Sequence, residues 1–434
     1  MLTRPGPPSP TARPARPRVL PCPLAARARV SNSAGSPGAQ HPTSPTARLP
    51  GSRTGRSEPT AYAGTVIPEP VSSPDFLSSA ALSAKIRGCL LGGALGDAAS
   101  GTGASSGTSI SAHTQLALYS LDGLLEAIEW ANEGVGADET ACVWLAYLRW
   151  MRGRGLQLPA AGPSPLPRPI DSEPLLQPEG TGDAGAVDPD VLSALATGEM
   201  GTRQRPLNTG ADTPAALVRS APFGLLPYVE TETVYKLALD AASLTHGHPA
   251  ARHCAAVFAS TVHGLLAPGA TLRTAAGEAL DRARENAAPD FTDRLQAALA
   301  DDAAGTADRP SRASGTATAP ADDDAAVIPD RMPTAEEALT IGLRAALAVE
   351  DTALEVAARK QPASADDDAA DLAAATAAAI RIAAAAGGAP AAVVTGSLLG
   401  TRFAALPDAD LEALRERTMI EKLAAGFIAA TIAP

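Results

Sequence analysis

Apolar side chains recur at intervals of three and four residues along most of this 434-residue chain. That spacing places them on one face of an α-helix. Three stripes are clear: Ala117, Leu121, Leu124 and Ile128; Ala141, Trp144, Leu145 and Leu148; Cys254, Val257, Phe258, Thr261 and Leu265. Strand-like alternation is scarce, and its one tempting case, AAVVTG at 391–396, sits in a helical context. The sequence therefore predicts an all-α fold of about ten or more helices.

The composition favours closely spaced helices. Hydrophobic residues make up 45% of the chain and aromatic residues only 3%, so alanine, leucine and valine must form the core. The run GGALG at 92–96 is not followed by Gly-Lys-Ser/Thr, which argues against a nucleotide-phosphate loop. We expect its glycines to permit close helix packing instead. Trp130, Trp144 and Trp150 are expected to pack in the core, and Cys142 and Cys254, on apolar helical faces, to be buried. Thr334 and Glu337 have the spacing of a capping box at the start of another helix.

Charge and cysteine usage exclude several classes. The net charge of −12 argues against a general nucleic-acid binder. The four cysteines form no CxxC pair, hence neither a disulfide framework nor a zinc signature, and a reduced cytoplasm fits best. No run of about 18 apolar residues is present, so we expect no membrane span.

The chain divides into two regions by composition. Residues 1–75 are rich in Pro, Ser and Arg without a hydrophobic period, and we expect them to be disordered. Residues 76–434 carry the helical pattern and are predicted to form one domain. Three polar or Pro/Gly-rich stretches, near 153–190, 303–333 and 361–368, are predicted to be loop insertions in that domain.

Four groups of segments, in order, carry more specific motifs. They are KIRGCLLGGALGDAAS at 85–100; ISAHTQLALYSLDGLLEAIEWA at 110–131 with ACVWLAYLRW at 141–150; RPLNTGADTPAALVRSAPFGLLP at 205–227 with SLTHGHPAARHCAAVFASTVHGLL at 243–266; and GGAPAAVVTGSLLGTRFAALP at 387–407 with EEALTIGLRAAL at 336–347 upstream. Together they span about residues 82–430. In this order and spacing they resemble the ADP-ribosylglycohydrolase family.

The resemblance implies an all-α fold that binds two Mg²⁺ or Mn²⁺ ions between its helices. It implies removal of ADP-ribose from a modified protein side chain or a related conjugate. The expected partners are therefore ADP-ribose or an ADP-ribosylated protein. Hard cations held by carboxylates and a threonine hydroxyl suit such chemistry, because they orient the ribose and activate water.

Most metal-ligand positions of the family have lost their carboxylates here. Its first motif, Asp-Asp-Thr, matches Ala112, His113 and Thr114. Its second, Asp-x-Asp-Thr/Ser, falls where Ala389 and Ala391 stand. Only Thr114 keeps a family ligand, so we expect no metal cofactor, or Mg²⁺ or Mn²⁺ only if the family site works.

The other candidate residues are weaker. Asp97, in Gly-Asp-Ala, is either a carboxylate beside the site, and hence a catalytic candidate, or a helix cap. The family's glycine-rich phosphate loop retains only Gly210, while Asp212 would repel a phosphate and Pro214 lacks an amide hydrogen. His246, in THGHP, is a candidate to line the substrate pocket.

Three functional hypotheses follow. The first is a catalytically impaired family member, which binds an ADP-ribosylated protein or acts as a scaffold. The second is an active metal-dependent hydrolase that combines His113, Thr114 and Asp97 with an acid from 366–368. The third is an ADP-ribose-binding module without catalysis. His248 and His253 also permit a zinc site, but a third ligand at suitable spacing is missing. The sequence favours the first hypothesis.

Overall fold

The computed structural model describes residues 77–100, 109–160, 162–176, 187–287, 289–305, 332–359 and 365–432. These residues belong to one compact unit, Val71–Pro434. They form fourteen α-helices and two 3₁₀ helices, without a strand within the described ranges. The predicted all-α fold is confirmed. The predicted N-terminal extension, residues 1–75, lies outside the described residues.

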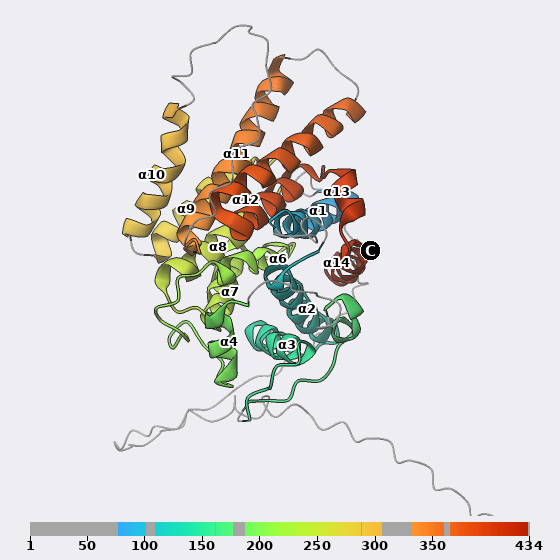
Figure 1. Cartoon of the computed structure of the whole chain (residues 1–434), viewed down its shortest axis with the longest axis vertical. Helices are drawn as coiled ribbons and strands as arrows, with labels where there is room; N and C mark the ends of the chain where they lie inside the picture. The colour runs from blue at the N-terminus through green and yellow to red at the C-terminus, as the bar shows by residue number, and fades with distance from the viewer. Residues whose placement is uncertain are drawn as a thin grey trace, which may run out of the picture. The chain divides into compact units, whose positions relative to one another are not determined.

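The helices follow one another along the chain in this order (Figure 1). They are α1 (Ser79–Ala98), α2 (Ala112–Asn132), α3 (Glu139–Gly153), η2 (Pro169–Ser172), η3 (Pro174–Leu176), α4 (Pro189–Ala196), α5 (Ala215–Val218), α6 (Ala221–Gly224), α7 (Thr231–Ser243), α8 (Pro249–Gly264), α9 (Leu272–Asn286), α10 (Pro289–Gly305), α11 (Ala335–Arg359), α12 (Ala365–Phe403), α13 (Asp408–Ala413) and α14 (Arg417–Thr431).

The closest helix packing joins α1 to the C-terminal half of α12. A Cβ added at Gly92 would lie 2.1 Å from the carbonyl oxygen of Gly396. Gly88 faces Gly400 and Gly96 faces Ala392 in the same way. The two helices therefore run antiparallel with their backbones in contact. This confirms that the glycines of 92–96 serve packing.

α12 is two helices joined at a kink. Gly387 (φ −139°, ψ 16°) and Gly388 (φ 66°, ψ −165°) leave the helical conformation, and the positive φ favours glycine at 388. Pro390 follows in the first turn of the second half, where a missing amide hydrogen costs no helical hydrogen bond. The strand-like run at 391–396 is therefore helical.

One described segment, Asp368–Phe403 within α12, passes a test of length and apolarity for a membrane span. The share of its most apolar window that is buried inside the protein is 67%. A core helix accounts for its composition, because α12 packs against both α1 and α11.

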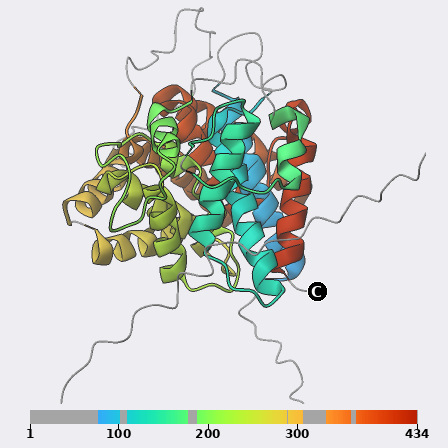
Figure 2. The ribbon, with the colours of Figure 1, turned by 90° about the horizontal axis from the view of Figure 1, so that it is seen from below.

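Other helices pack around α1 and α12 or against one another. α14 lies beside α1 and α2 (Figure 2), and α8 packs against α7 and α9. The capping box at Thr334 is confirmed, since Thr334 N donates to Glu337 Oε2 at 2.8 Å and Glu337 N donates to Thr334 Oγ1 at 3.3 Å. Cys142 and Cys254 are buried as expected. Trp130 was expected in the core, and that prediction is wrong: 43% of it is exposed, near the C-terminal end of α2.

The predicted loop insertions are described in part. η2 and η3 lie within 153–190, and the last two residues of that range are already in α4. α10 runs to Gly305, and α12 begins at Ala365. Residues 306–331 and 361–364 lie outside the described ranges.

Substitution of Gly92 tests the close packing. Gly92→Ala would place a methyl group against the Gly396 carbonyl, and overpacking of this kind costs about 1–3 kcal/mol or more. We expect a lower urea midpoint of unfolding. The matched control is Gly277→Ala in α9, whose added Cβ has no neighbour within 4 Å. The control should keep or raise the midpoint, because alanine favours a helix by up to about 1 kcal/mol. Equal effects at both positions would contradict the packing argument.

Candidate functional site

Asp97 ends α1 and caps the start of α2. Its Oδ2 accepts hydrogen bonds from Ser111 N (2.8 Å) and Thr114 N (3.2 Å), and its Oδ1 accepts one from Ser111 Oγ (2.7 Å). The side chain is buried. A carboxylate at a helix N-terminus satisfies amides that have no intrahelical partner. Of the two interpretations of Asp97, the geometry therefore gives direct evidence for the cap.

The start of the second half of α12 lies at the same end of α1. Gly96, the neighbour of Asp97, packs against the carbonyl of Ala392. Ala391, one residue earlier, is fully buried. The fold thus gathers at one end of α1 the first turn of α2, with Ala112 and Thr114, and the segment that holds Ala391.

Among the described residues, the side-chain donors at this end do not fit a pair of Mg²⁺ or Mn²⁺ ions. Ala112, Ala389 and Ala391 have no donor atom, and the oxygens of Asp97 already accept three hydrogen bonds. Hard divalent cations need several oxygen ligands. The Thr114 hydroxyl is buried and has no hydrogen-bond partner among the described residues. The one retained ligand oxygen therefore has no described side-chain oxygen bonded to it.

His113 does not replace the missing carboxylates. Its Nδ1 lies 3.2 Å from Ser111 Oγ and 4.0 Å from Asp97 Oδ1. The imidazole therefore interacts with the same cap that Asp97 forms. A neutral imidazole also cannot balance a dication as an aspartate does.

The acids at 366–368 start α12, far from this place. The helix is regular from Ala365 to the kink at Gly387. At about 1.5 Å per residue, the 19 residues from Asp368 to Gly387 span roughly 30 Å. The start of α12 therefore lies far from Thr114, and a ligand from 366–368 has no geometric support.

A second group of polar side chains lies at the start of α4. Asp188, Asp190 and His246 place one potential ligand atom each within 4.8 Å of one another, and this is the one such group among the described residues. By donor type and spacing these three residues could hold a metal ion. Asp188 is also the N-cap of α4, because its Oδ1 accepts from Asp190 N (2.8 Å) and Val191 N (3.3 Å).

A chain of short hydrogen bonds runs through this group. Arg219 Nη2 lies 2.6 Å from Thr245 Oγ1, which lies 2.7 Å from His246 Nδ1. On the other side of the ring, His246 Nε2 lies 2.7 Å from Thr213 Oγ1, which donates to Asp188 Oδ2 at 2.5 Å. A guanidinium only donates and an ionised carboxylate only accepts, so every proton in the chain points from Arg219 toward Asp188. We call these five residues the relay.

The relay fixes the state of His246. Burial first, and the positive charge of Arg219 second, lower the pKa of His246 to about 3. The ring is therefore neutral, with its proton on Nε2. Both ring nitrogens are engaged, so a metal ion at Nε2 would have to displace the Thr213 hydroxyl.

Asp190 is less well satisfied. Burial first, and then the carboxylates of Asp188 and Asp212, raise its pKa. Three acids of like charge thus lie close together at the start of α4. A cation would relieve their repulsion.

The loop in the position of the family's phosphate-binding loop is closed on itself. Ala211 N and Gly247 N both donate to the carbonyl of Asn208, each at 2.9 Å. Asn208, and not Gly210, has the positive φ of this loop (47°). Gly210 is exposed, with open space around its Cβ position. The amides of Ala211 and Gly247 are therefore used internally, and nothing in the backbone requires glycine at 210.

Of the two histidines considered for zinc, His253 is engaged by another side chain. His253 Nδ1 lies 2.7 Å from the Tyr235 hydroxyl. Burial first and Arg252 second lower the pKa of His253 to about 4. His248 is the residue before α8. Neither residue belongs to a metal-binding group within the described part of the chain.

Sequence reasoning found His246 but missed its partners. Asp188-Pro-Asp190 is a strong helix-start signal, since an Asp cap followed by proline is typical of a first turn. It falls at the edge of the stretch predicted as an insertion, 153–190. Thr213 and Arg219 lie in the motif stretch 205–227, but only tertiary structure brings them to His246.

Comparison with known proteins gives a family model and matches among the solved structures. A family model described as ADP-ribosylglycohydrolase matches residues 78–433. A solved structure described as an ADP-ribosylglycohydrolase-related protein complex is similar to 82% of this chain and 99% of its own, with 19% identity and a TM-score of 0.44. No curated protein matches the chain.

The relay predicts a defined cost for losing the Thr213 hydroxyl. Thr213→Val keeps the side-chain shape but leaves His246 Nε2–H and one oxygen of Asp188 without this partner. Buried polar groups left unpaired cost about 1–3 kcal/mol each, which chemical denaturation would detect. Thr352→Val in α11, whose exposed hydroxyl bonds only the Ala348 carbonyl, is the matched control. It should change the unfolding free energy by about 0.5 kcal/mol or less.

The lowered pKa of His246 predicts a pH dependence. The folded pKa of about 3 lies below the unfolded value of about 6.5, so only the unfolded chain takes up this proton as the pH falls below 6.5. Between pH 7 and pH 5 the folded state should lose about 2 kcal/mol through this group. His246→Asn should remove that part of the slope when unfolding free energies are measured across this range. An unchanged slope would show that His246 is not held neutral.

Proposed function

The chain belongs to the ADP-ribosylglycohydrolase family, and from this premise we propose that it is a catalytically impaired member that acts as a protein scaffold. It keeps the family's helices but does not hydrolyse ADP-ribose conjugates through a pair of metal ions. The cysteines that lie in the described part of the chain are buried as free thiols. We therefore place the protein in a reducing cytoplasm.

The donor set at the end of α1 carries this proposal. Thr114 is the one family ligand position with its expected residue, and its hydroxyl has no partner. Asp97, the adjacent carboxylate, caps α2. A dinuclear site would supply the Lewis acidity that activates water, and these residues cannot hold one. The core positions of the motifs are unaffected, so the fold persists without the chemistry.

The loop at 208–214 argues for a scaffold over an ADP-ribose reader. A diphosphate needs free amides or cations. Here Ala211 N is already bonded, Pro214 has no amide hydrogen, and Asp212 adds negative charge. We infer that the pyrophosphate of ADP-ribose has no cradle in this loop.

A second candidate function rests on the acids at the start of α4. Asp188, Asp190 and His246 have the donor types of a single metal site, and Asp190 is destabilised by its acidic neighbours. This candidate is a hydrolase with one ion bound at that place. It requires the Thr213 hydroxyl to leave the relay.

Calorimetric titration of the full chain with ADP-ribose, with and without excess Mg²⁺ or Mn²⁺, tests the proposal. We expect no saturable heat in either case and no release of ADP-ribose from a modified peptide. Saturable binding that tightens with metal, together with turnover, would overturn it. Asp190→Asn would then test the second candidate, since loss of that binding would place the ion at the start of α4. Binding without metal dependence or turnover would favour a reader.

Restoring one ligand pair should not restore activity. In Ala112→Asp with His113→Asp, the second pair is still missing at Ala389 and Ala391. We therefore expect no metal-dependent turnover in a product-release assay. Adding Ala389→Asp and Ala391→Asp to the same protein supplies both pairs and is the matched comparison. Activity in the double variant would show that ligands come from another part of the chain.

A further inference from the structure

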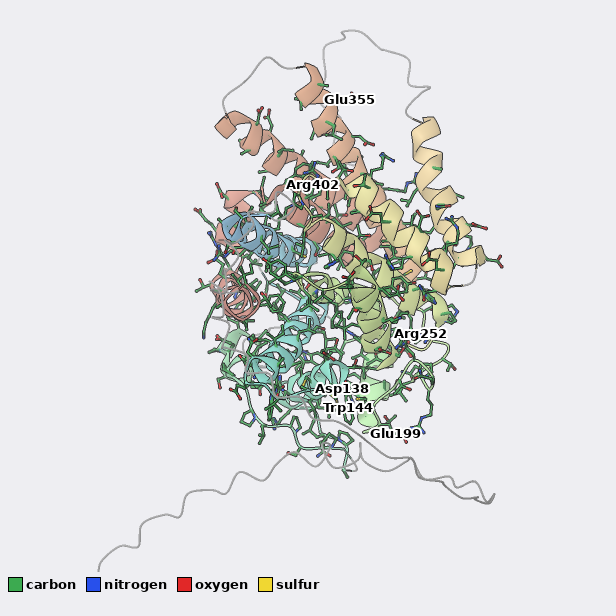
Figure 3. The ribbon with its side chains drawn as sticks, turned by 180° about the vertical axis from the view of Figure 1, so that it is seen from behind. Asp138, Trp144, Glu199, Arg252, Glu355 and Arg402 are labelled. Carbon is green, nitrogen blue, oxygen red and sulfur yellow. The ribbon has the colours of Figure 1, made fainter. Side chains whose placement is uncertain are left out.

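A cavity of about 570 Å³ lies away from the end of α1, between α2, the start of α3 and α7. Its volume is within the range of small-molecule sites. Asp138, the N-cap residue of α3, lies at its α3 side and is labelled in Figure 3. Apolar side chains line its floor: Leu124, Ala127, Ile128, Leu226, Val229 and Leu237.

Residues 200–204 form the remaining wall of the cavity, and contacts with α7 hold this segment in place. A Cβ at Gly201 would lie 2.1 Å from the Ser243 carbonyl, so the wall packs directly against the end of α7. Leu207 N also donates to that carbonyl, at 3.2 Å. Arg203 Nε pairs with Asp240 Oδ1 at 2.6 Å. These contacts hold the cavity open without a ligand, and such preorganisation lowers the cost of binding.

The charges around the cavity are not balanced. Its two cations are already paired, Arg203 with Asp240 and Lys236 with Glu232 (3.0 Å). Asp138 and Glu139 make no ion pair with the described residues. Asp138 uses Oδ1 to cap α3 through Ala141 N (2.9 Å), which leaves its second oxygen and the whole Glu139 carboxylate available.

Asp240, a third acid that lines the cavity, is also affected by this excess of negative charge. Burial is the main cause of the raised pKa of Asp240, and the Asp138 carboxylate adds to it. A positively charged group beside Asp138 would therefore also reduce the repulsion between Asp138 and Asp240. An anion would meet these acids before it reached the paired cations.

We propose that this cavity binds a small organic cation, in which an apolar body contacts Ile128 and Leu237 and an ammonium group lies between Asp138 and Glu139. The apolar floor provides burial, and the two carboxylates provide selectivity for charge. The site is independent of the metal-ligand positions, so this inference does not rest on the proposed function.

Three probes of one shape and different charge test it on the full chain: phenethylamine, phenethyl alcohol and 3-phenylpropanoate. Ligand-observed NMR or calorimetry at low salt should give the tightest binding for the amine. The carboxylate should bind at least about tenfold more weakly, with the alcohol between them. The affinity of the amine should fall as salt rises, because both carboxylates are exposed.

Paired variants locate the site. Asp138→Asn with Glu139→Gln should weaken the amine to the affinity of the alcohol, and asparagine preserves the α3 cap. Glu133→Gln with Glu285→Gln removes the same charge from exposed positions outside the cavity and should leave binding unchanged. Thr233→Trp, on the rim, should block all three probes by filling the cavity.

Three results would overturn the proposal. They are no detectable binding of the amine at concentrations of about 10 mM, equal or tighter binding of the carboxylate, and equal loss in the two double variants. Thermal unfolding of each variant separates lost binding from lost folding. If Asp138→Asn with Glu139→Gln unfolds, Thr233→Trp alone decides, and persistent binding in that variant rejects the site.

Discussion

The rest of the described fold depends on the backbone contact between α1 and the second half of α12. Gly88, Gly92 and Gly96 let the two helices meet without side chains between them. The contact fixes the end of α1, and therefore fixes Asp97, which holds the first turn of α2 through two amides. It also fixes the kink at Gly387 and Gly388, because the C-terminal half of α12 must turn to follow α1. None of these contacts uses a side chain of Ala112, Ala389 or Ala391, so the helices hold their positions without carboxylates at these residues.

Sequence reasoning predicted what depends on local spacing. The all-α class, the packing role of the glycines at 92–96 and the capping box at Thr334 each rest on neighbours a few residues apart, and the structure confirms all three. The prediction for Trp130 was wrong because the apolar spacing of a helix does not show where that helix leaves the core. The role of Asp97 stayed open because its partners lie across the connection to α2. The relay could not be predicted, since Asp188 and His246 meet only after α4 folds against the segment that follows α7.

Buried acids in this protein act mainly on helix starts. Asp97 caps α2, Asp188 caps α4, and Glu350 accepts the amides of Leu272 and Arg273 at the start of α9 (2.8 and 3.1 Å). Glu350 also pairs with Arg402 near the C-terminal end of α12 (2.5 Å). A buried carboxylate is costly unless it is hydrogen-bonded or paired, and the free amides and positive end of a helix supply that compensation. The chain has a net charge of −12, so buried acids are available for this purpose. Asp97, Asp188 and Glu350 each stabilise the start of a helix, although a buried acid can suggest a catalytic group.

The same physics explains why the acids near His246 do not by themselves imply a bound ion. In the relay, two hydroxyl groups and a neutral imidazole connect Arg219 Nη2 to Asp188, and each link of this chain has one donor and one acceptor. Nε and Nη1 of Arg219 are buried without a hydrogen-bond partner among the described residues. A dication at His246 Nε2 would displace the proton that this nitrogen donates to Thr213. It would also be repelled by the positive charge of Arg219, which acts on the same ring. Only Asp190 and Asp212 remain without compensation of this kind. The relay therefore satisfies the buried part of the cluster as a cation would, and any affinity for an ion must come from the acids at its outer edge.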